Sequence, residues 1–291
     1  MVRTYAQLYL DARSRLMQQE DAEMASQLAR HLVCFVSGKS REAFLTDRET
    51  IAPPEVCLQL DKAVQRICNQ EPLAYVLGEW SFYGLDLYVN PDVLIPRDDT
   101  CPLVDTVLNQ TRSLGWEPRI LDLCTGSGCI GLALASRIPS ARVTLADISE
   151  GALAVAKKNV SRRKLGGRAC CVQVDALRPA PDYLGKFHAI VSNPPYITTA
   201  EMETLDASVR EYEPHLALCG GEDGLAFYRS IVENFTRALR PGGFLAFEFG
   251  EGQGNAICDI LEAHGYTVLE RANDYHGTQR AVLARYDRKE E

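Results

Sequence analysis

The sequence has 291 residues, of which 46% are hydrophobic and 24% charged, and these proportions belong to a folded globular protein rather than to a disordered chain. A formal net charge of −8 at pH 7 argues against wide, non-specific binding to nucleic acid through a basic surface. No apolar run approaches the ~20 residues that a membrane helix needs, and no signal-peptide core follows the first methionine, so we expect a soluble, cytoplasmic protein.

The acidic excess lies entirely after residue 70. Of the 31 Lys and Arg and the 39 Asp and Glu, residues 1–70 hold nine of each, which leaves 22 basic and 30 acidic residues beyond them. A basic macromolecular partner suits that part of the chain better than DNA does. The ten cysteines show no Cys-x-x-Cys spacing, which favours reduced, buried thiols and predicts neither a metal site nor a disulfide framework.

Residues 1–70 are expected to form a small helical domain, because their apolar residues recur at helical spacing. One helical face carries Tyr5, Leu8, Ala12 and Leu16. The segment 21–36 repeats the pattern, and Pro53-Pro54 opens a third helix. Apolar stripes of this kind are usually packing surfaces, so we interpret them as core.

Residues 71–100 change to a strand-like pattern and are expected to link two domains. Apolar and aromatic residues at 80–83 and 85–89 flank Gly84, which predicts a short β-hairpin. The run Val93-Leu94-Ile95 leads into Pro96-Arg97 and is assigned to the same linker. Arg97 with Asp98-Asp99 makes a charged loop ahead of the next helix.

After residue 118, predicted strands alternate with predicted helices, as in a mostly parallel sheet with crossover helices. Parallel strands are expected at 119–123, 142–146, 169–174, 187–191 and 244–249. Helices are expected at 130–136, at 149–160 with Ser149 as the cap, and at 224–239 before Pro241-Gly242-Gly243. The segments 266–269 and 279–286 are expected to form a final antiparallel pair.

A glycine loop, Gly126-x-Gly128-x-x-Gly131, joins the first of these strands to its helix. Glycine allows backbone to approach a ligand closely, and Asp147 ends the next strand, where its carboxylate can accept hydrogen bonds from two ribose hydroxyls. The pattern predicts a nucleoside cofactor, although a structural glycine turn also satisfies it, and the same spacing occurs in dinucleotide-binding proteins. An NAD oxidoreductase also needs an acid/base partner such as His or Tyr with Lys, and we find no such set at a strand end.

Asn193-Pro194-Pro195-Tyr196 follows the apolar run 187–191. Proline cannot continue a strand, so Asn193 is expected at the carboxyl end of the sheet, which faces the ligand crevice. The motif can be a plain turn. It also suits a planar nitrogen nucleophile: the Asn193 side-chain oxygen and the Pro194 carbonyl would accept its hydrogens, and Tyr196 would lie against its planar face.

These residues resemble the class I S-adenosylmethionine-dependent methyltransferases, and more closely the HemK/PrmC family of release factor glutamine methyltransferases. The resemblance covers nearly the whole chain. Besides the glycine loop and residues 193–197, its motifs are Pro72-Leu73-Ala74-Tyr75-Val76-Leu77-Gly78, Phe82-Tyr83-Gly84, Val93-Leu94-Ile95-Pro96-Arg97 and Asp274-x-x-Gly277-x-x-Arg280. The tetrapeptide alone is shared with DNA amino-methyltransferases, whereas its combination with Ile95-Pro96-Arg97 and the helical domain is specific.

The resemblance implies an α/β fold of the Rossmann-like class I methyltransferase type, with a mostly parallel seven-stranded sheet. Residues 1–70 would form a helical substrate-recognition domain, 71–100 a hairpin linker and 101–291 the methyltransferase domain. It implies methylation, with S-adenosylmethionine, of the side-chain nitrogen (N5) of the glutamine in the Gly-Gly-Gln motif of peptide chain release factors. The chain would then act in translation termination, with release factors as partners and without direct nucleic-acid or membrane binding, and we expect a monomer.

The resemblance also implies roles for individual residues. The cofactor's methionine part would be held by Cys124, Thr125, Gly126, Ser127 and Gly128, its ribose by Asp147, and its adenine edge by Asp175 and Ala176, with Asn193 beside the cofactor. The glutamine amide would be held by Asn193, Pro194, Pro195 and Tyr196, of which Asn193, Pro194 and Tyr196 would be catalytic.

Three positions depart from the family pattern. Cys124 stands where the family usually has glycine, Asp98-Asp99 stand in place of Pro-Glu, and Ala176 replaces a commonly larger residue, which puts adenine stacking there in doubt.

The segment 198–222 is either a surface loop or a docking element, and we expect Glu211 and Glu213 to meet a basic release-factor domain. Two rival functions remain, a nucleic-acid amino-methyltransferase acting on adenine or cytosine and a non-catalytic binding module.

Overall fold

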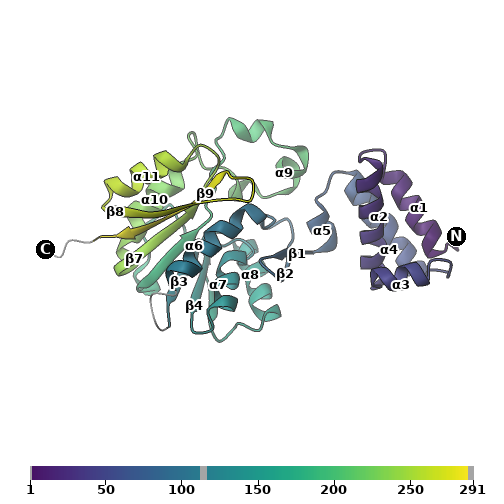
Figure 1. Cartoon of the computed structure of the whole chain (residues 1–291), viewed down its shortest axis with the longest axis horizontal. Helices are drawn as coiled ribbons and strands as arrows, with labels where there is room; N and C mark the ends of the chain where they lie inside the picture. The colour runs from purple at the N-terminus through teal and green to yellow at the C-terminus, as the bar shows by residue number, and fades with distance from the viewer. Residues whose placement is uncertain (1, 112–116, 288–291) are drawn as a thin grey trace. The chain divides into compact units, whose positions relative to one another are not determined.

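The computed structural model describes residues 2–111 and 117–287, and the chain divides into two compact units (Figure 1). The smaller unit comprises Met1–Gly78 and Ala207–Tyr212, and the larger comprises Glu79–Asp206 and Glu213–Glu291. The predicted parts 1–70, 71–100 and 101–291 are functional divisions, and they stay predictions.

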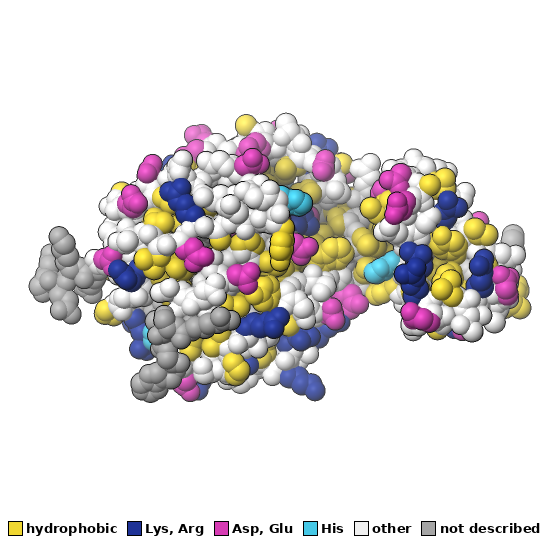
Figure 2. Space-filling model, in the orientation of Figure 1, with side chains coloured by type: hydrophobic (Ala, Val, Ile, Leu, Met, Phe, Trp, Pro, Cys, Tyr) yellow, Lys and Arg dark blue, Asp and Glu magenta, His cyan; other side chains and the backbone are white. Residues whose placement is uncertain are grey.

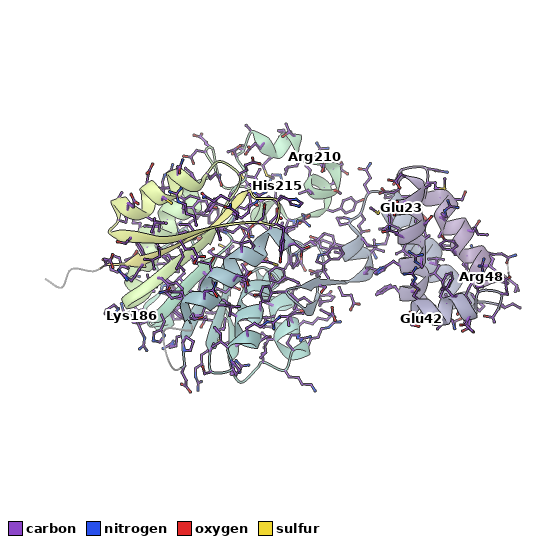
Figure 3. All side chains as sticks on the ribbon, in the orientation of Figure 1. Glu23, Glu42, Arg48, Lys186, Arg210 and His215 are labelled. Atoms are coloured by element: carbon purple, nitrogen blue, oxygen red, sulfur yellow. The ribbon has the colours of Figure 1, made fainter. Side chains whose placement is uncertain are left out.

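The smaller unit is helical. It contains α1 (Tyr5–Leu16), α2 (Ala22–Ser37), α3 (Arg41–Thr46), α4 (Pro54–Cys68), α5 (Leu73–Leu77) and α9 (Ala207–Tyr212). Its core includes the fully buried Leu8 and Leu32 and the nearly fully buried Leu60, from the apolar faces of α1, α2 and α4. Charged side chains such as Glu23, Glu42 and Arg48 are exposed and point away from this core (Figure 3).

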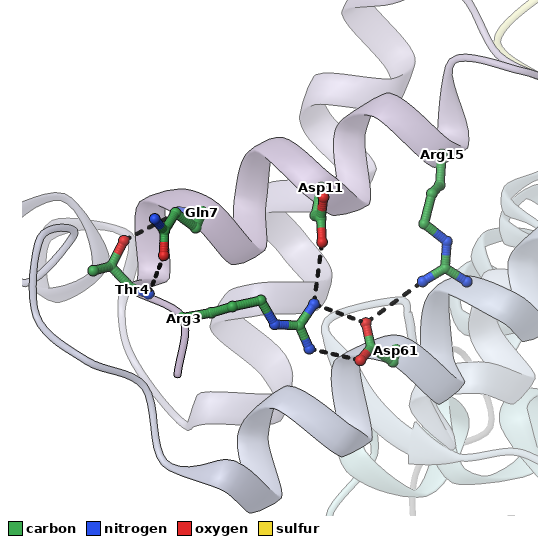
Figure 4. Close-up of polar contacts among 6 residues, drawn as sticks. All are labelled: Arg3, Thr4, Gln7, Asp11, Arg15 and Asp61. Carbon is green, nitrogen blue, oxygen red and sulfur yellow. Dashed lines mark hydrogen bonds and ion pairs between the residues drawn. The ribbon is translucent and has the colours of Figure 1, made fainter. Parts of the chain in front are cut away.

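Polar contacts fix the start of α1 (Figure 4). Thr4 and Gln7 form a capping box, in which each side chain accepts the other's backbone N–H. Arg3 donates to Asp61 of α4 at 2.6 Å and to Asp11 of α1 at 3.1 Å, so it ties these two helices together.

The larger unit begins with a hairpin of β1 (Glu79–Phe82) and β2 (Leu85–Tyr88). Tyr83 and Gly84 both have positive φ, at 51° and 77°, as the tight turns that suit the twist of paired strands require. The predicted hairpin is therefore present. The run Val93-Leu94-Ile95 forms no strand; Val93 and Ile95 are instead buried in irregular backbone.

A seven-stranded sheet forms the centre of the larger unit, in the order β5-β4-β3-β6-β7-β9-β8. Its strands are β3 (Arg119–Leu123), β4 (Arg142–Asp147), β5 (Ala169–Gln173), β6 (Phe187–Ser192), β7 (Leu239–Glu248), β8 (Tyr266–Asn273) and β9 (Gln279–Tyr286). Within the described residues, β9 is antiparallel to β7 and β8 and the other neighbours are parallel. The strand order reverses between β3 and β6, and ligands bind at such a switch point.

Helices cover both faces of this sheet (Figure 1). One face packs against α6 (Cys101–Thr111), α7 (Cys129–Arg137) and α8 (Glu150–Arg162), and the other against α10 (Ala226–Phe235) and α11 (Gly254–Ala263). Alternate strand residues supply the two cores; in β3, Ile120 joins the first and Leu121 the second. The predicted mostly parallel α/β architecture is confirmed.

Three predicted segments differ from the structure. The helix predicted at 224–239 is shorter, because α10 ends at Phe235 and a 3₁₀ turn, Thr236–Ala238, follows. Strand β7 starts at Leu239, which already pairs with Phe187 of β6, and the Pro-Gly-Gly sequence forms an irregularity within that pairing. The segment 198–222 is not a plain loop; it contains the short helices Glu201–Thr204, Ala207–Tyr212 and His215–Ala217.

None of the helices in the two described stretches is both long enough and apolar enough to span a membrane. On the viewed face of the larger unit, acidic and basic side chains are interspersed (Figure 2).

Candidate active site

The glycine loop turns sharply between β3 and α7. Gly128 precedes α7 with φ of 82°, and a Cβ there would come within 3.2 Å of Leu132 and 3.3 Å of Leu145, so both backbone and space require glycine. Cys124 also has positive φ, at 59°. A left-handed backbone of this kind favours glycine, and Cys124 adopts it with a side chain present.

Asp122, which the sequence did not single out, holds this loop from within. It is fully buried, and its Oδ2 accepts hydrogen bonds from the Thr125 hydroxyl at 2.5 Å and the Gly131 N–H at 2.8 Å. Burial raises the pKa of Asp122 to about 7. The carboxyl therefore orders the loop without facing the cavity.

Asn159 fixes the other side of the same loop. This fully buried residue of α8 donates to the carbonyls of Ser127 and Tyr88, each at 2.9 Å, and accepts from the Tyr88 N–H at 2.7 Å. The hairpin strand β2 and the glycine loop are thus joined through one side chain.

Asp147 lies at the end of β4, as predicted from the sequence. Its Oδ2 accepts from the Gly126 N–H at 2.9 Å and its Oδ1 from the Ser149 N–H at 3.0 Å. Burial raises the pKa of this carboxyl above its usual value. Each oxygen retains a lone pair, so the carboxylate can also accept from a diol in the cavity.

A cavity of about 260 Å³ lies at the switch point of the sheet. The predicted residues that line it are Cys124, Thr125, Gly126, Ser127, Asp147, Asp175, Ala176, Asn193 and Pro195. Gly128, Pro194 and Tyr196 are not among the lining residues; Gly128 packs against Leu132 and Leu145 beneath the loop. The structure therefore brings most of the predicted cofactor and substrate residues around one space, and their individual roles stay predictions.

Apolar side chains form the wall beside Asp175 and Ala176. Ile148, 42% exposed, and Leu177, 48% exposed, both line the cavity, as does Phe227. These side chains can flank a planar base where Ala176 itself is too small to stack. The sequence analysis missed them, although Ile148 and Leu177 directly follow residues that it had identified.

The donors and acceptors of this cavity suit a nucleoside cofactor. The Asp147 carboxylate fits a ribose diol, and the apolar wall fits a base with the Asp175 carboxyl at its edge. Gly126 has open space where a Cβ would stand, and the buried Ser127 hydroxyl has no partner within the described residues. The space beside Gly126 and the Ser127 hydroxyl could therefore accommodate a polar group of the ligand at the loop end of the cavity. No group of three or more His, Cys, Asp or Glu side chains in residues 2–111 and 117–287 is placed to hold a metal ion.

Asn193 follows the last residue of β6 and is half-buried at the cavity wall. The Ser192 hydroxyl donates to the carbonyl of Leu123 at 2.6 Å and fixes the end of β6 to β3. The Asn193 side-chain nitrogen lies 3.5 Å from the Thr100 hydroxyl, to which it donates a long hydrogen bond. Asn193 is thus presented to the same space as Asp147.

Contacts with Gln253 and Gly250 hold Tyr196 in place. Its carbonyl accepts from the Gln253 side chain at 3.0 Å, and its ring packs so closely on Gly250 that a Cβ there would lie 3.1 Å away. Burial raises the pKa of its hydroxyl. Tyr196 therefore stays neutral near pH 7 and its ring is fixed in place, and its predicted catalytic role stays a prediction.

Arg97 and Glu213 form an ion pair that closes one wall of the cavity. The Glu213 side chain is 1% exposed, accepts from Arg97, and also accepts from the Ile95 N–H at 3.2 Å. The expectation that Glu213 meets a basic partner is therefore wrong, because its carboxylate is buried and already paired. Glu211 is exposed, and its predicted contact with a partner stays a prediction.

Asp99 and Asp274 share Arg280, which explains two sequence features. Arg280 pairs with Asp274 at 3.1 Å and with Asp99 at 3.4 Å. Gly277 has φ of 86°, so the Asp274-to-Arg280 motif contains a tight turn. The turn places Arg280 beside Asp99. The unusual Asp99 has an arginine partner.

Comparison with known proteins shows which protein family this chain resembles in sequence. Residues 7–78 match a family model described as PrmC N-terminal domain, and residues 100–220 match the Methyltransferase small domain. The release factor glutamine methyltransferases of Geobacter sulfurreducens and Clostridium acetobutylicum are 41% and 37% identical to it over 232 and 253 residues. These matches cover 80% and 87% of this chain, and 79% and 88% of the relatives.

Among solved structures, the hMettl16 catalytic domain in complex with MAT2A 3'UTR hairpin 6 is similar, with a TM-score of 0.56 and 16% identity. The match covers 81% of this chain and 82% of that chain. At this identity the similarity shows the fold alone. Together with the methyltransferase model and the strand order, it confirms the predicted class I methyltransferase fold.

Proposed function

Since this chain belongs to the release factor glutamine methyltransferase family, we propose that it methylates the side-chain amide nitrogen (N5) of the glutamine in the Gly-Gly-Gln motif of peptide chain release factors. The methyl donor is S-adenosylmethionine. One observation supports this most: Asn193, at the end of β6, lines the same cavity as Asp147 and the glycine loop. The proposed acceptor and donor sites would therefore be adjacent.

When bound, S-adenosylmethionine supplies a methyl group activated by a positive sulfur. Asp147 would hold its ribose, and residues 124–128 would hold the methionine part. Ile148 and Leu177 would enclose the adenine, with Asp175 at its edge. The Asp147 carboxylate would bind the ribose while it also accepts from the Gly126 N–H.

An amide nitrogen is a poor nucleophile, because its lone pair is delocalised into the carbonyl group. The Asn193 side-chain oxygen and the Pro194 carbonyl would accept its two N–H groups and favour the pyramidal, electron-rich nitrogen of the transition state. The prolines restrict the backbone that carries these acceptors. As the new N–C bond forms, the bond from the methyl carbon to sulfur would break and the nitrogen would lose one proton to water. The products would be a neutral N-methyl amide and the neutral thioether S-adenosylhomocysteine.

The helical part of the chain is the proposed recognition element for the protein substrate. Residues 7–78 match a domain model of their own, and the helical unit has a separate core. The charge balance after residue 70 supports a basic protein partner, which would be attracted to the 30 acidic residues there.

A labelling experiment tests this function. The protein is incubated with methyl-labelled S-adenosylmethionine and, in separate reactions, with release factor, DNA and RNA. We expect label on the release factor alone. Label on DNA or RNA but not on the release factor would show that the function is that of a nucleic-acid amino-methyltransferase.

A further inference from the structure

Glu248 is a buried acid beside the proposed acceptor site. It is the last residue of β7, and its neighbour Phe247 pairs with Ser192 at the end of β6, so Glu248 and Asn193 lie next to each other across two parallel strands. Glu248 is only 2% exposed and does not line the cavity, whereas Asn193 and Thr100 do. Glu248 therefore does not contact the cavity itself, whereas its neighbours Asn193, Thr100 and Cys129 line it.

The surroundings of Glu248 favour an interaction with the Asn193 amide. The side chains of Thr100 and Asn193 both lie within hydrogen-bonding reach of the carboxyl, and Arg280 stabilises its charge whereas Asp99 opposes it. Among the described residues, no donor lies at hydrogen-bond distance and angle from its Oε2 atom. Hydrogen bonds of this kind are often long without substrate and tighten when substrate binds.

We propose that Glu248 is a positioning residue, whose carboxylate accepts a hydrogen bond from the Asn193 side-chain nitrogen and so directs the Asn193 side-chain oxygen into the cavity. The inference deepens the proposed function and rests on it. An asparagine amide has a donor end and an acceptor end. With the ends exchanged, its oxygen would face the carboxylate and its N–H groups would face the substrate N–H groups, and both contacts would be repulsive.

Protonation of Glu248 weakens this arrangement. Burial raises its pKa to about 7, and the hydrogen bonds and Arg280 only partly offset that shift. The groups that face it are Asp99, Thr100, Cys101, Cys129, Asn193, Tyr196, Tyr228 and Arg280. Burial raises the pKa of Cys101 to about 11 and that of Cys129 to about 12, so these thiols do not titrate near neutral pH.

The kinetic test compares the whole chain with Glu248→Gln and Glu248→Leu, and with Glu251→Gln as an exposed control on the neighbouring loop. In wild type, kcat should rise with pH through about 7. Glu248→Gln keeps an acceptor, so it should lose about tenfold in kcat and show no such rise, whereas Glu248→Leu should lose about 100-fold. KM for the cofactor should change less than about twofold in both, as expected of a loss confined to the transition state.

A rise of kcat near pH 7 that persists in Glu248→Gln would overturn the inference, because the titrating group would then be another one, such as Asp122. An equal rise in KM for the cofactor in both variants would indicate a merely structural role and would also overturn it.

A second readout needs no methyl acceptor. The side-chain NH₂ resonances of Asn193, identified by their absence from Asn193→Ala, should shift with pH around 7 in wild type and stay fixed in Glu248→Gln. If they do not shift in wild type, the positioning role is wrong, whatever the substrate is. If they shift but release factor is not methylated, the proposed function fails and the positioning role stands.

Discussion

Asn193 combines two properties that are seldom found in one side chain: it is half-buried against Thr100, and it still faces the cavity. The first property limits the rotamers of the amide, and the second makes its oxygen available to a substrate N–H. Methyl transfer therefore depends on a hydrogen-bond acceptor with a fixed direction. This acceptor stabilises the transition state only when the substrate N–H points at it.

Asn193→Ala removes that acceptor and leaves Asp147 and the glycine loop unchanged. We expect methyl transfer to fall by about 100-fold or more, the usual cost of losing one such polar contact in a transition state. The affinity for S-adenosylmethionine, measured by calorimetry, should stay within about threefold, less than 1 kcal/mol. Turnover at the wild-type rate would contradict the role given to Asn193.

Sequence reasoning found Asn193 and Asp147 because each follows an apolar strand and is marked by local signals, prolines in one case and a preceding glycine loop in the other. It could not find the partners of Glu213. Arg97 and Ile95 lie more than 100 positions away in the chain, and a glutamate before a proline looks like a surface residue. Asp122 was missed for a similar reason, since its burial depends on neighbouring strands and helices.

At the scale of elements, Asn159 joins β2, α8 and the glycine loop. Asn159→Ala leaves two carbonyls and one N–H without these partners, and we expect it to lower the free energy of unfolding by about 3 kcal/mol. Cofactor affinity should fall as well, because the loop loses its support. Denaturant unfolding measures the first effect, with the exposed Asn109→Ala of α6 as control. Equal stability of the two variants would contradict this role.

The Arg97–Glu213 pair joins the segment before α6 to the segment after α9, and both segments line the cavity. Glu213→Gln should reduce stability by about 1–3 kcal/mol, because the buried group that accepts from Arg97 loses its negative charge. The partial exposure of Arg97 limits this value. KM for the cofactor should rise. The exposed Glu211→Gln should change stability by less than about 0.5 kcal/mol, and thermal melting of both variants is the check. A Glu213→Gln melt that matches the Glu211→Gln melt would contradict the buried role.

Most strands and the longest helices followed from sequence pattern, whereas α3, α5 and the ten-residue α11 did not. Strand β3 at 119–123 and strand β9 at 279–286 have the predicted bounds, because apolar runs bounded by loops specify buried strands well. Helices α3 and α5 have six and five residues, fewer than two full helical turns of periodic signal. Strand β7 begins at Leu239 because this residue pairs with Phe187 of β6. Pro241 and the two glycines after it predict a turn, so the sequence does not indicate this early start.

At the scale of the whole molecule, the two units have separate cores, so their functions can be separated. A chain that begins at residue 79 should bind S-adenosylmethionine within about threefold of the full affinity, while kcat/KM for release factor falls by at least about tenfold. Calorimetry and methylation assays measure the two quantities. Unchanged kcat/KM would show that the helical unit does not recognise the substrate.

The position of the transferred methyl group decides whether this chain methylates the glutamine of the Gly-Gly-Gln motif. Release factor is methylated by the full chain, digested, and sequenced by tandem mass spectrometry, alongside a release factor whose Gly-Gly-Gln glutamine is replaced by alanine. The account predicts one added methyl group, on the side-chain nitrogen of that glutamine, and none in the replaced protein. A methyl group on any other residue, or equal labelling of both proteins, would contradict it.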